Sequence, residues 1–457
     1  MRKALLFCLA PALLIAVPAA QAVTYPAPGD PGTIKHHPNG KHVTFFACKT
    51  GKGRIHAKKG VNAIQRAVNL AAAGDTVRVC NGTYKGGVTI ETKAKAGLKL
   101  IGNVKSPKKV LIELKGAKPA VAQNGVIVNE ANGVTVSGFW ARHYKGNGFF
   151  ANHVTGYTFT HLVASMGGEY GIYAFKSKGG TMANDVGYYN NDAGFYIGGT
   201  PPQTKPLRSV LKNDKAFGNV IGFSGTNVRY VTITKSDFYN NGTGVVPNAL
   251  TSEPYLTPEH NTIINNRIFW NNFDYHHGTP FKLGGTSTGD VAYPAGVGAL
   301  LFGGRFNVIK NNAVFGNYQA GAGMLDQLLL AGDKNPAVRK GSVLVGNSIV
   351  GNTFGLGGDL DRNGRDVFYA GSGRQNCVSG NTGTHNNLPV SGDTFQPCPF
   401  AGTNTPNQDA LATLLAFATA TDPEKTWIKY PHRAIKGLKP LETCAVVTDG
   451  CKGQPKG

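Results

Sequence analysis

The sequence predicts an all-β chain wound into a right-handed parallel β-helix, with a short helix capping its N-terminal end. Two observations lead to this prediction. A glycine followed by an apolar residue recurs every 22 to 28 residues, at Gly148, Gly171, Gly194, Gly222 and Gly244. Short apolar runs are separated by Asn and Gly turns, and 62 of the 457 residues are glycines. A period near 23 residues with no helical stretch is typical of a β-solenoid.

A second repeat places two asparagines five residues apart around an apolar residue. It occurs at Asn266 and Asn271, at Asn312 and Asn317, and at Asn347 and Asn352. Asn tolerates the unusual backbone angles of tight turns, and its side-chain amide can bond the Asn of the coil above or below. One coil cannot bury its apolar side chains or pair its backbone alone, so stacked coils complete one another.

The segment before the repeat predicts a helix and then short strands. Apolar residues at Val61, Ile64, Val68 and Ala71 have helical spacing with one apolar face. The run Thr76–Val79 then alternates like a strand. We expect the helix to cover the open N-terminal edge of the coil, which would otherwise invite strand addition.

The first residues predict export. Arg2 and Lys3 precede an apolar run, and Ala20-Gln21-Ala22 ends it with the pattern that signal peptidase reads. The expected layout is a signal peptide (1–22), a basic N-terminal extension (23–59), the β-helix (60–390) and a C-terminal tail with a disulfide (391–457). No apolar run in the mature chain reaches the roughly 18 residues of a membrane span. We expect a secreted or extracytoplasmic monomer that is not transmembrane.

Removal of the signal leaves six cysteines, an even number that fits three disulfides in an exported protein. Six cysteines allow 15 connectivities, and the sequence does not choose among them. Neighbours in the sequence suggest the pairs Cys48–Cys80, Cys377–Cys398 and Cys444–Cys451.

The net charge of +22 is concentrated at the two ends of the chain. Residues 35–118 carry 18 Lys and Arg against 3 acids, and residues 425–457 carry 7 against 2. Residues 119–424 are almost neutral, with 20 basic and 19 acidic residues. Basic ends on an exported protein indicate docking on an anionic polymer. Export and the lack of a nucleic-acid-binding motif argue against nucleic acid as the partner.

The run from Ala63-Ile64-Gln65 through Gly74-Asp75-Thr76-Val77 to Gly82-Thr83-Tyr84 resembles the N-terminal cap and first coil of the pectin-lyase-like superfamily. The Asn-rich repeats resemble the body of its right-handed parallel β-helices, and the likeness covers residues 60–387. The superfamily includes polysaccharide lyases, glycoside hydrolases, uronan epimerases, phage tailspikes and coils without known chemistry. The resemblance therefore implies the fold and a polysaccharide ligand, but it does not imply one reaction.

The first candidate site is the run Asp274, Tyr275, His276 and His277, with Lys282 nearby. It lies where a coil ends and a Gly-rich insertion begins, and such insertions build the walls of grooves. It departs from the Asp-Pro-His-Asp motif of uronan epimerases by lacking the Pro and the second Asp. His, Tyr or Lys can serve as the base of a lyase. The other interpretation, which we favour here, is a polar surface loop.

The second candidate is a column of acids at equivalent repeat positions, Asp185, Asp214 and Asp237, which we expect to stack about 5 Å apart on successive coils. Close carboxyls raise one another's pKa and can supply the acid and base of glycoside hydrolysis, or they can bind a cation. The favoured interpretation is structural: Asn266 and Asn312 continue the same column, so Asp replaces Asn in a ladder that bonds turn N–H groups.

The third candidate is a Ca²⁺ loop with Asp359, Asp361 and Asn363 as ligands. Asp-x-Asp-x-Asn-Gly is the first half of an EF-hand-like loop. Ala370 stands where a bidentate Glu is expected, and Arg362 and Arg365 oppose a cation. A turn held by Arg–Asp pairs is the favoured interpretation, and Ca²⁺ is the cofactor that the other one implies.

Two functions follow from these residues. The leading one is an exported β-helix that binds a polysaccharide and cleaves it as a lyase or a glycoside hydrolase. The alternative is a non-catalytic cell-wall or surface protein, held to anionic polymers by its basic ends. No G-x-x-x-x-G-K-[ST], G-x-S-x-G or H-E-x-x-H motif supports nucleotide, serine-hydrolase or zincin chemistry.

Overall fold

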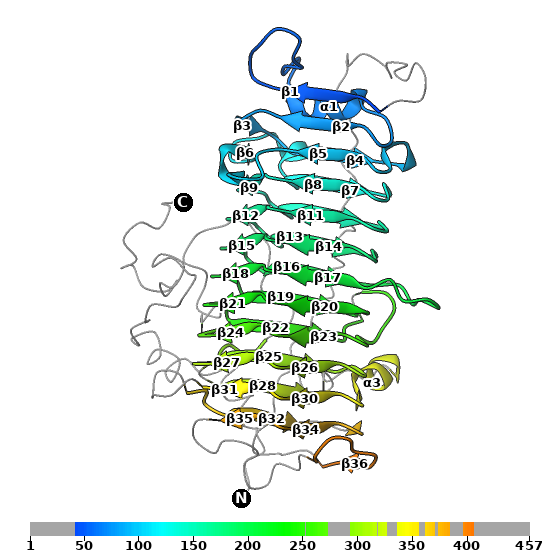
Figure 1. Ribbon diagram of the computed structural model, residues 1–457, viewed down its shortest axis with the longest axis vertical. Coiled ribbons are helices and arrows are strands. Elements are labelled where there is room, and N and C mark those ends of the chain that lie inside the picture. The colour runs from blue at the N-terminus through cyan, green and yellow to red at the C-terminus, as the bar shows by residue number, and fades with distance from the viewer. Residues whose placement is uncertain are drawn as a thin grey trace, which may run out of the picture.

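The computed structural model confirms the right-handed parallel β-helix (Figure 1). It describes residues 42–251, 253–272, 293–317, 319–326, 336–355, 362–370, 373–383 and 396–405. The coils stack along one long axis, and each coil passes once through three parallel sheets. A coil visits the twelve-stranded sheet first, then the eleven-stranded sheet and then the ten-stranded sheet.

Each sheet takes one strand from each successive coil. The strands of the twelve-stranded sheet are β1 (Thr44–Ala47), β2 (Thr76–Val79), β5 (Lys99–Ile101), β8 (Thr135–Ser137), β11 (Thr158–Thr160), β14 (Thr181–Ala183), β17 (Ser209–Lys212), β20 (Val231–Thr234), β23 (Thr262–Ile264), β26 (Val308–Lys310), β30 (Ser348–Val350) and β34 (Cys377–Ser379). Those of the eleven-stranded sheet are β3 (Gly82–Lys85), β6 (Val110–Glu113), β9 (Trp140–Arg142), β12 (Val163–Ser165), β15 (Val186–Tyr188), β18 (Lys215–Phe217), β21 (Asp237–Tyr239), β24 (Arg267–Phe269), β27 (Ala313–Phe315), β31 (Thr353–Phe354) and β35 (Thr382–Gly383).

The ten-stranded sheet completes the coil, and a small sheet follows at the C-terminal end. The strands of the ten-stranded sheet are β4 (Val88–Glu91), β7 (Val126–Asn129), β10 (Phe149–Asn152), β13 (Ile172–Phe175), β16 (Ala193–Gly198), β19 (Ile221–Thr226), β22 (Thr243–Asn248), β25 (Val297–Phe302), β28 (Ala320–Leu325) and β32 (Val367–Ala370). The small sheet contains β29 (Leu344–Val345), β33 (Gly373–Arg374) and β36 (Thr403–Asn404). The helices are α1 (Ala63–Leu70), η2 (Lys93–Lys95), η3 (Pro107–Lys109), η4 (Pro119–Val121) and α3 (Pro336–Ser342).

The Gly-apolar repeat predicts the strand register of the ten-stranded sheet correctly. Ile172 pairs with Phe149 and Phe195, and Phe223 pairs with Phe195 and Val245. These side chains are buried in the interior of the coil. The 28-residue step between Gly194 and Gly222 keeps the register because the extra residues lie between β16 and β17.

Asparagine ladders stabilise the turns as expected. In the first ladder Asn312 accepts hydrogen bonds from the backbone N–H and the side-chain amide of Asn266, and Asn352 accepts the same two bonds from Asn312. Asn266 itself accepts a hydrogen bond from the backbone N–H of Ser236. A second ladder runs through Asn190, Asn219, Asn241, Asn271, Asn317 and Asn363. A third runs through Asn261, Asn307, Asn347, Asn376 and Asn404. The motif at Asn347 therefore begins in a different ladder from the motif at Asn266.

The N-terminal end of the coil is occupied by α1, which is shorter than the predicted helix. The Asn62 side chain accepts a hydrogen bond from Gln65 N at 2.8 Å and so starts the helix at Ala63. Ile64 and Val68 are buried with the core residues of the first coils. The coil itself begins before residue 60, where the sequence places its start, because β1 pairs in parallel with β2.

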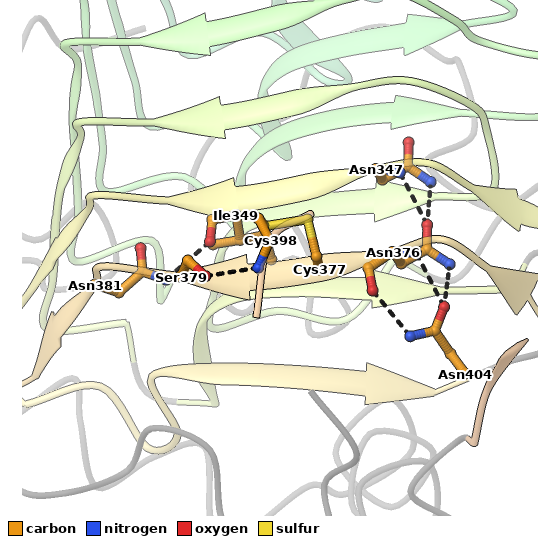
Figure 2. Close-up of a disulfide and its surroundings, with 8 residues drawn as sticks. All are labelled: Asn347, Ile349, Asn376, Cys377, Ser379, Asn381, Cys398 and Asn404. Carbon is orange, nitrogen blue, oxygen red and sulfur yellow. Dashed lines mark hydrogen bonds between the residues drawn. A yellow bond between two sulfur atoms is a disulfide. The ribbon is translucent and has the colours of Figure 1, made fainter. Parts of the chain in front are cut away.

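The C-terminal coil shows how a ladder and a disulfide act together (Figure 2). Asn404 accepts hydrogen bonds from Asn376, which in turn accepts them from Asn347. Beside this ladder Cys377 of β34 is joined to Cys398. The predicted pairs Cys48–Cys80 and Cys377–Cys398 are thus confirmed. Cys444 and Cys451 lie outside the described residues, and no described helix is both long and apolar enough to cross a membrane.

Candidate active site

The outer face of the ten-stranded sheet carries a column of aromatic rings. Phe150, Tyr173 and Tyr196 occupy paired positions on β10, β13 and β16, each directly after an inward-facing apolar residue. Side chains alternate along a strand, so these three point outward. The rings of Phe150 and Tyr173 are stacked with centroids 4.4 Å apart, and Tyr196 meets Tyr173 edge-on at 4.8 Å.

A fourth ring and two carboxyls join this column from the turn that leads into the sheet. Tyr170 lies 4.4 Å from the Tyr196 ring and 4.9 Å from the Tyr173 ring, measured between centroids. Glu169 and Asp192 occupy the same turn position on successive coils, since Asp192 N donates to the Glu169 carbonyl at 3.1 Å. Successive coils therefore bring two half-buried carboxyls beside the tyrosines.

The third carboxyl comes from the segment between β22 and β23. The buried Asn227 side chain donates to the carbonyls of Leu250, at 2.8 Å, and of Glu253, at 2.9 Å, and so holds this segment in place. Tyr196 Oη donates a hydrogen bond to Glu253 Oε1. A Cβ at Gly198 would lie 2.6 Å from Glu253 Oε2, so this position requires glycine for the carboxyl to approach the sheet.

Burial controls the protonation of this cluster, which we call the tyrosine–carboxyl cluster (Glu169, Tyr170, Tyr173, Asp192, Tyr196 and Glu253). Burial raises the pKa of Glu253 to about 8, and the Tyr196 hydrogen bond opposes that rise. Burial also raises the pKa of Glu169. The pKa of Tyr170 lies well above its ordinary value because of burial and then because of the nearby charges of Asp192, Glu169 and Glu253. Glu253 is therefore a protonated carboxylic acid at neutral pH.

This arrangement suits proton transfer to a sugar oxygen. Glu253 Oε2 is buried and has no hydrogen-bond partner among the described residues. Glu169 and Asp192 supply further carboxyls, and the aromatic column supplies ring faces and edges. Within the described residues no group of three or more His, Cys, Asp or Glu side chains is placed to hold a metal ion.

Two of the three predicted acids stack as the repeat predicts. The Asp185 N–H donates to Asp214 Oδ1 at 2.9 Å, and both side chains are buried. Asp185 in turn accepts hydrogen bonds from Leu162 N and Ala183 N. Burial raises the pKa of Asp214 to about 8, and burial together with the neighbouring Asp214 raises the pKa of Asp185 well above its ordinary value. Asn266 and Asn312 continue this ladder, as the structural interpretation expects.

The expected position of Asp237 is wrong by one residue. Ser236, not Asp237, follows Asp214 in the ladder, because Asp214 N donates to Ser236 Oγ at 3.1 Å. Asp237 pairs with Lys215 on β18 and lies on the outer face of the eleven-stranded sheet. There it forms an ion pair with Arg267, with Nη2 and Oδ2 at 2.6 Å. Lys215 and Asp237 are paired in the sheet, so the residues before them, Asp214 and Ser236, are also neighbours on successive coils.

The other predicted residues are only partly covered by the structure. Asp274, Tyr275, His276, His277 and Lys282 lie outside the described residues, and so do Asp359 and Asp361. Asn363 belongs to the second asparagine ladder: its Oδ1 accepts from Asn317 N and Nδ2, both at 3.1 Å. That oxygen is the atom a Ca²⁺ site would use. Ca²⁺ binding by this loop stays a prediction.

The sequence reasoning missed all three carboxyls of the tyrosine–carboxyl cluster. A signal for two of them was present, because Glu169 and Asp192 each stand two residues before a repeat glycine, Gly171 and Gly194. Glu253 has no repeat position, since it lies in a connection between coils. Only the fold brings it to Tyr196.

Comparisons with solved structures return parallel β-helix proteins. The A-module of the mannuronan C-5 epimerase AlgE4 from Azotobacter vinelandii is similar over 70% of this chain and 92% of its own, with 15% identity and a TM-score of 0.44. A rhamnogalacturonan lyase is similar over 62% and 81%, with 15% identity and a TM-score of 0.42. The pectate lyase Pel9A is similar over 76% and 78%, with 14% identity and a TM-score of 0.39. No protein-family model and no curated protein matches the chain.

Proposed function

We propose that this protein binds a polysaccharide along the outer face of the ten-stranded sheet and cleaves its glycosidic bonds at the tyrosine–carboxyl cluster. The observation that carries the proposal is the pair formed by Tyr196 and Glu253. It combines a carboxylic acid, protonated because its pKa is about 8, with a phenol that fixes its orientation. A raised pKa in one carboxyl beside other carboxyls is the pattern that glycoside hydrolysis uses.

Each group has a role in this reaction. Glu253 donates its proton to the glycosidic oxygen as the bond between that oxygen and the anomeric carbon breaks. A water molecule attacks the anomeric carbon, and Glu169 or Asp192 accepts the proton that this water loses. Tyr196 donates to Glu253 Oε1 and so leaves Oε2 as the oxygen that carries the proton. The rings of Phe150 and Tyr173 continue the column beyond Tyr196, and all three rings are buried, so they stack on one another and fix the position of the Tyr196 hydroxyl.

The acid-rich cluster favours hydrolysis over β-elimination. A lyase requires a base at the carbon next to the uronate and a cation or donor at its carboxylate. Lys176 is close enough to Glu253 to oppose the rise of its pKa, so one cation borders the cluster. A lyase that uses Tyr196 as its acid or base is the second candidate. The two disulfides are consistent with an extracytoplasmic location, where such polymers occur.

The mature protein should be tested on a panel of neutral and acidic polysaccharides for new reducing ends and for 4,5-unsaturated uronates. Reducing ends without unsaturated product are the expected result and identify a hydrolase. Reducing ends together with unsaturated product identify the lyase. Binding without either product on every polymer would overturn cleavage and leave the non-catalytic binding protein.

A further inference from the structure

The first coils present a surface that is basic and carries no exposed acid. Residues 42–118 contain 16 Lys and Arg against 3 acidic residues. Fourteen of these basic residues are exposed, namely Lys49, Lys52, Arg54, Lys58, Lys59, Arg78, Lys85, Lys93, Lys99, Lys105, Lys108, Lys109, Lys115 and Lys118. The positive charge predicted from the sequence is therefore at the surface.

The three acids of this region serve the fold instead. Asp75 is buried and accepts hydrogen bonds from Val43 N at 2.8 Å and Ala72 N at 2.7 Å. Glu113 is buried and pairs with Arg142 and His143 of the next coil. Glu91 is half-buried and accepts from Asn129. None of them is placed among the exposed cations, so the field at this end stays positive.

A shallow depression lies within this surface, at the turn between the twelve-stranded and eleven-stranded sheets. Arg78 and Lys105 contribute its charges, and Asn81 and Asn103 contribute amides that are joined by a 2.9 Å hydrogen bond. Its volume is about 470 Å³, and none of the residues that line it is acidic. The depression is open to solvent, so a polymer chain can lie across it.

The spacing of the cations suits a linear polymer of repeated negative charges. Arg78 and Lys99 lie on β2 and β5, the paired strands of successive coils, which are about 5 Å apart along the axis. The Cys48–Cys80 disulfide fixes one side of the depression, because Cys80 is one of its lining residues. A disulfide here indicates an oxidising compartment, where the abundant linear polyanions are acidic glycans rather than nucleic acids.

We propose that this depression and its exposed lysines bind an anionic polysaccharide, separately from the tyrosine–carboxyl cluster. Arg78 and Lys105 contact the sulfate, phosphate or carboxylate groups of the polymer, and Asn81 and Asn103 contact its hydroxyls. The cluster on β13 and β16 lies two to four coils away, about 10 to 19 Å along the axis, and on another sheet. The protein is thus held to one polymer while a different site acts on a substrate.

The test compares two double variants of the full mature chain. Arg78→Ser with Lys105→Ser removes two charges from the depression. Lys212→Ser with Lys310→Ser is the control and removes two exposed charges from the twelve-stranded sheet. Both lysines lie in the same register row of that sheet as Arg78, but on distant coils. Binding is measured with dextran sulfate, polygalacturonate, uncharged dextran and duplex DNA at several salt concentrations, with thermal melts as a check on folding.

The expected result is binding of dextran sulfate or polygalacturonate that weakens with salt and no binding of dextran. The Arg78/Lys105 variant should bind about tenfold more weakly with a shallower salt dependence, and the Lys212/Lys310 variant should bind within about twofold of wild type. Equal losses in both variants, no loss in either, or tighter binding of DNA than of both glycans would overturn the proposal. Cleavage of a soluble substrate should be unchanged by the Arg78/Lys105 pair, so this result is independent of the proposed activity.

Discussion

Two places in this molecule hold carboxyls whose pKa is raised to about 8 by burial, and they differ in what surrounds them. Asp214 and its neighbour Asp185 lie in a turn where backbone N–H groups of adjacent coils donate to them. Glu253 instead lies on the outer face of a sheet, held by a phenol and bordered by tyrosines and two further carboxyls. The same rise in pKa accompanies a structural ladder in one place and a candidate acid catalyst in the other.

This difference shows that a raised pKa alone does not identify a site. The ladder carboxyls substitute for asparagines, and their surroundings leave no room for a ligand because the coils above and below contact them directly. In the cluster, segments distant in sequence converge on one face, and Asn227 holds one of them in place. Convergence of groups from several elements is the better indicator of chemistry.

The largest effect is expected on catalysis. Glu253→Gln removes the proton donor and should lower kcat/KM by about 100-fold or more. Asp214→Asn should leave kcat/KM within about twofold of wild type, because an asparagine fits the ladder. Glu130→Gln is a matched control: Glu130 is exposed and follows β7, about three coils, or roughly 14 Å, from the Glu253 carboxyl beside β16. Equal losses in the Glu253 and Asp214 variants would remove the distinction between the two places.

The next effect is on the pH dependence of stability. The folded pKa of Asp214 is about 8 against an ordinary value of 3.8, so the unfolded chain loses this proton at a lower pH than the folded chain. Unfolding therefore releases a proton between about pH 4 and pH 8, and stability falls as pH rises through that range. A tenfold difference in proton affinity between the folded and unfolded chain corresponds to about 1.4 kcal/mol, so the loss of stability in wild type should amount to a few kcal/mol.

Asp214→Asn should remove the part of this fall that Asp214 contributes, because the amide has no proton to lose and can donate to the backbone as Asn266 does to Ile233 O. The raised pKa values of Asp185 and Glu253 should leave the remainder of the fall in this variant. Urea unfolding at pH 5 and pH 8 measures both proteins. A wild-type stability that is constant or rises over this range would contradict the buried, protonated pair.

The smallest effect separates the two aromatic columns. Tyr188, Phe217, Tyr239, Phe269 and Phe315 form a stack on the outer face of the eleven-stranded sheet, with centroids 4.7 to 5.2 Å apart. Tyr196→Phe removes the hydrogen bond that lowers the pKa of Glu253, so kcat/KM should fall about 10-fold and the alkaline limb of its pH profile should move upward. Tyr188→Phe makes the same change in the other column and should alter neither. A shared response would mean that the hydroxyl of Tyr196 acts only through packing.

The fold could be predicted from the sequence because the repeat is local and periodic. Each Gly-apolar pair reports the register of the ten-stranded sheet, and each interior Asn reports a turn. The error at Asp237 arose where two turns carry the same residue type one position apart. Periodicity gives the strand but does not give the ladder position within a two-residue turn.

The tyrosine–carboxyl cluster was not predicted, because its members do not share one periodic position. Tyr173 and Tyr196 belong to the repeat, whereas Glu253 reaches them from a connection between coils that obeys no repeat. A single sequence gives no pairing between such a connection and the sheet. The charged end is the intermediate case: composition located it, and the structure added that its acids are buried or half-buried and that most of its cations are exposed.

The most direct test of the central claim is the pH dependence of kcat/KM for the wild-type protein and Glu253→Gln on the polysaccharide that the panel identifies. A general acid with a pKa of about 8 predicts activity that is retained at neutral pH and falls about tenfold per pH unit above pH 8. Glu253→Gln should lose most of the activity. Any activity that remains should no longer fall above pH 8. A Glu253→Gln enzyme that retains wild-type activity with the same limb would contradict the assignment of the cluster as the catalytic site.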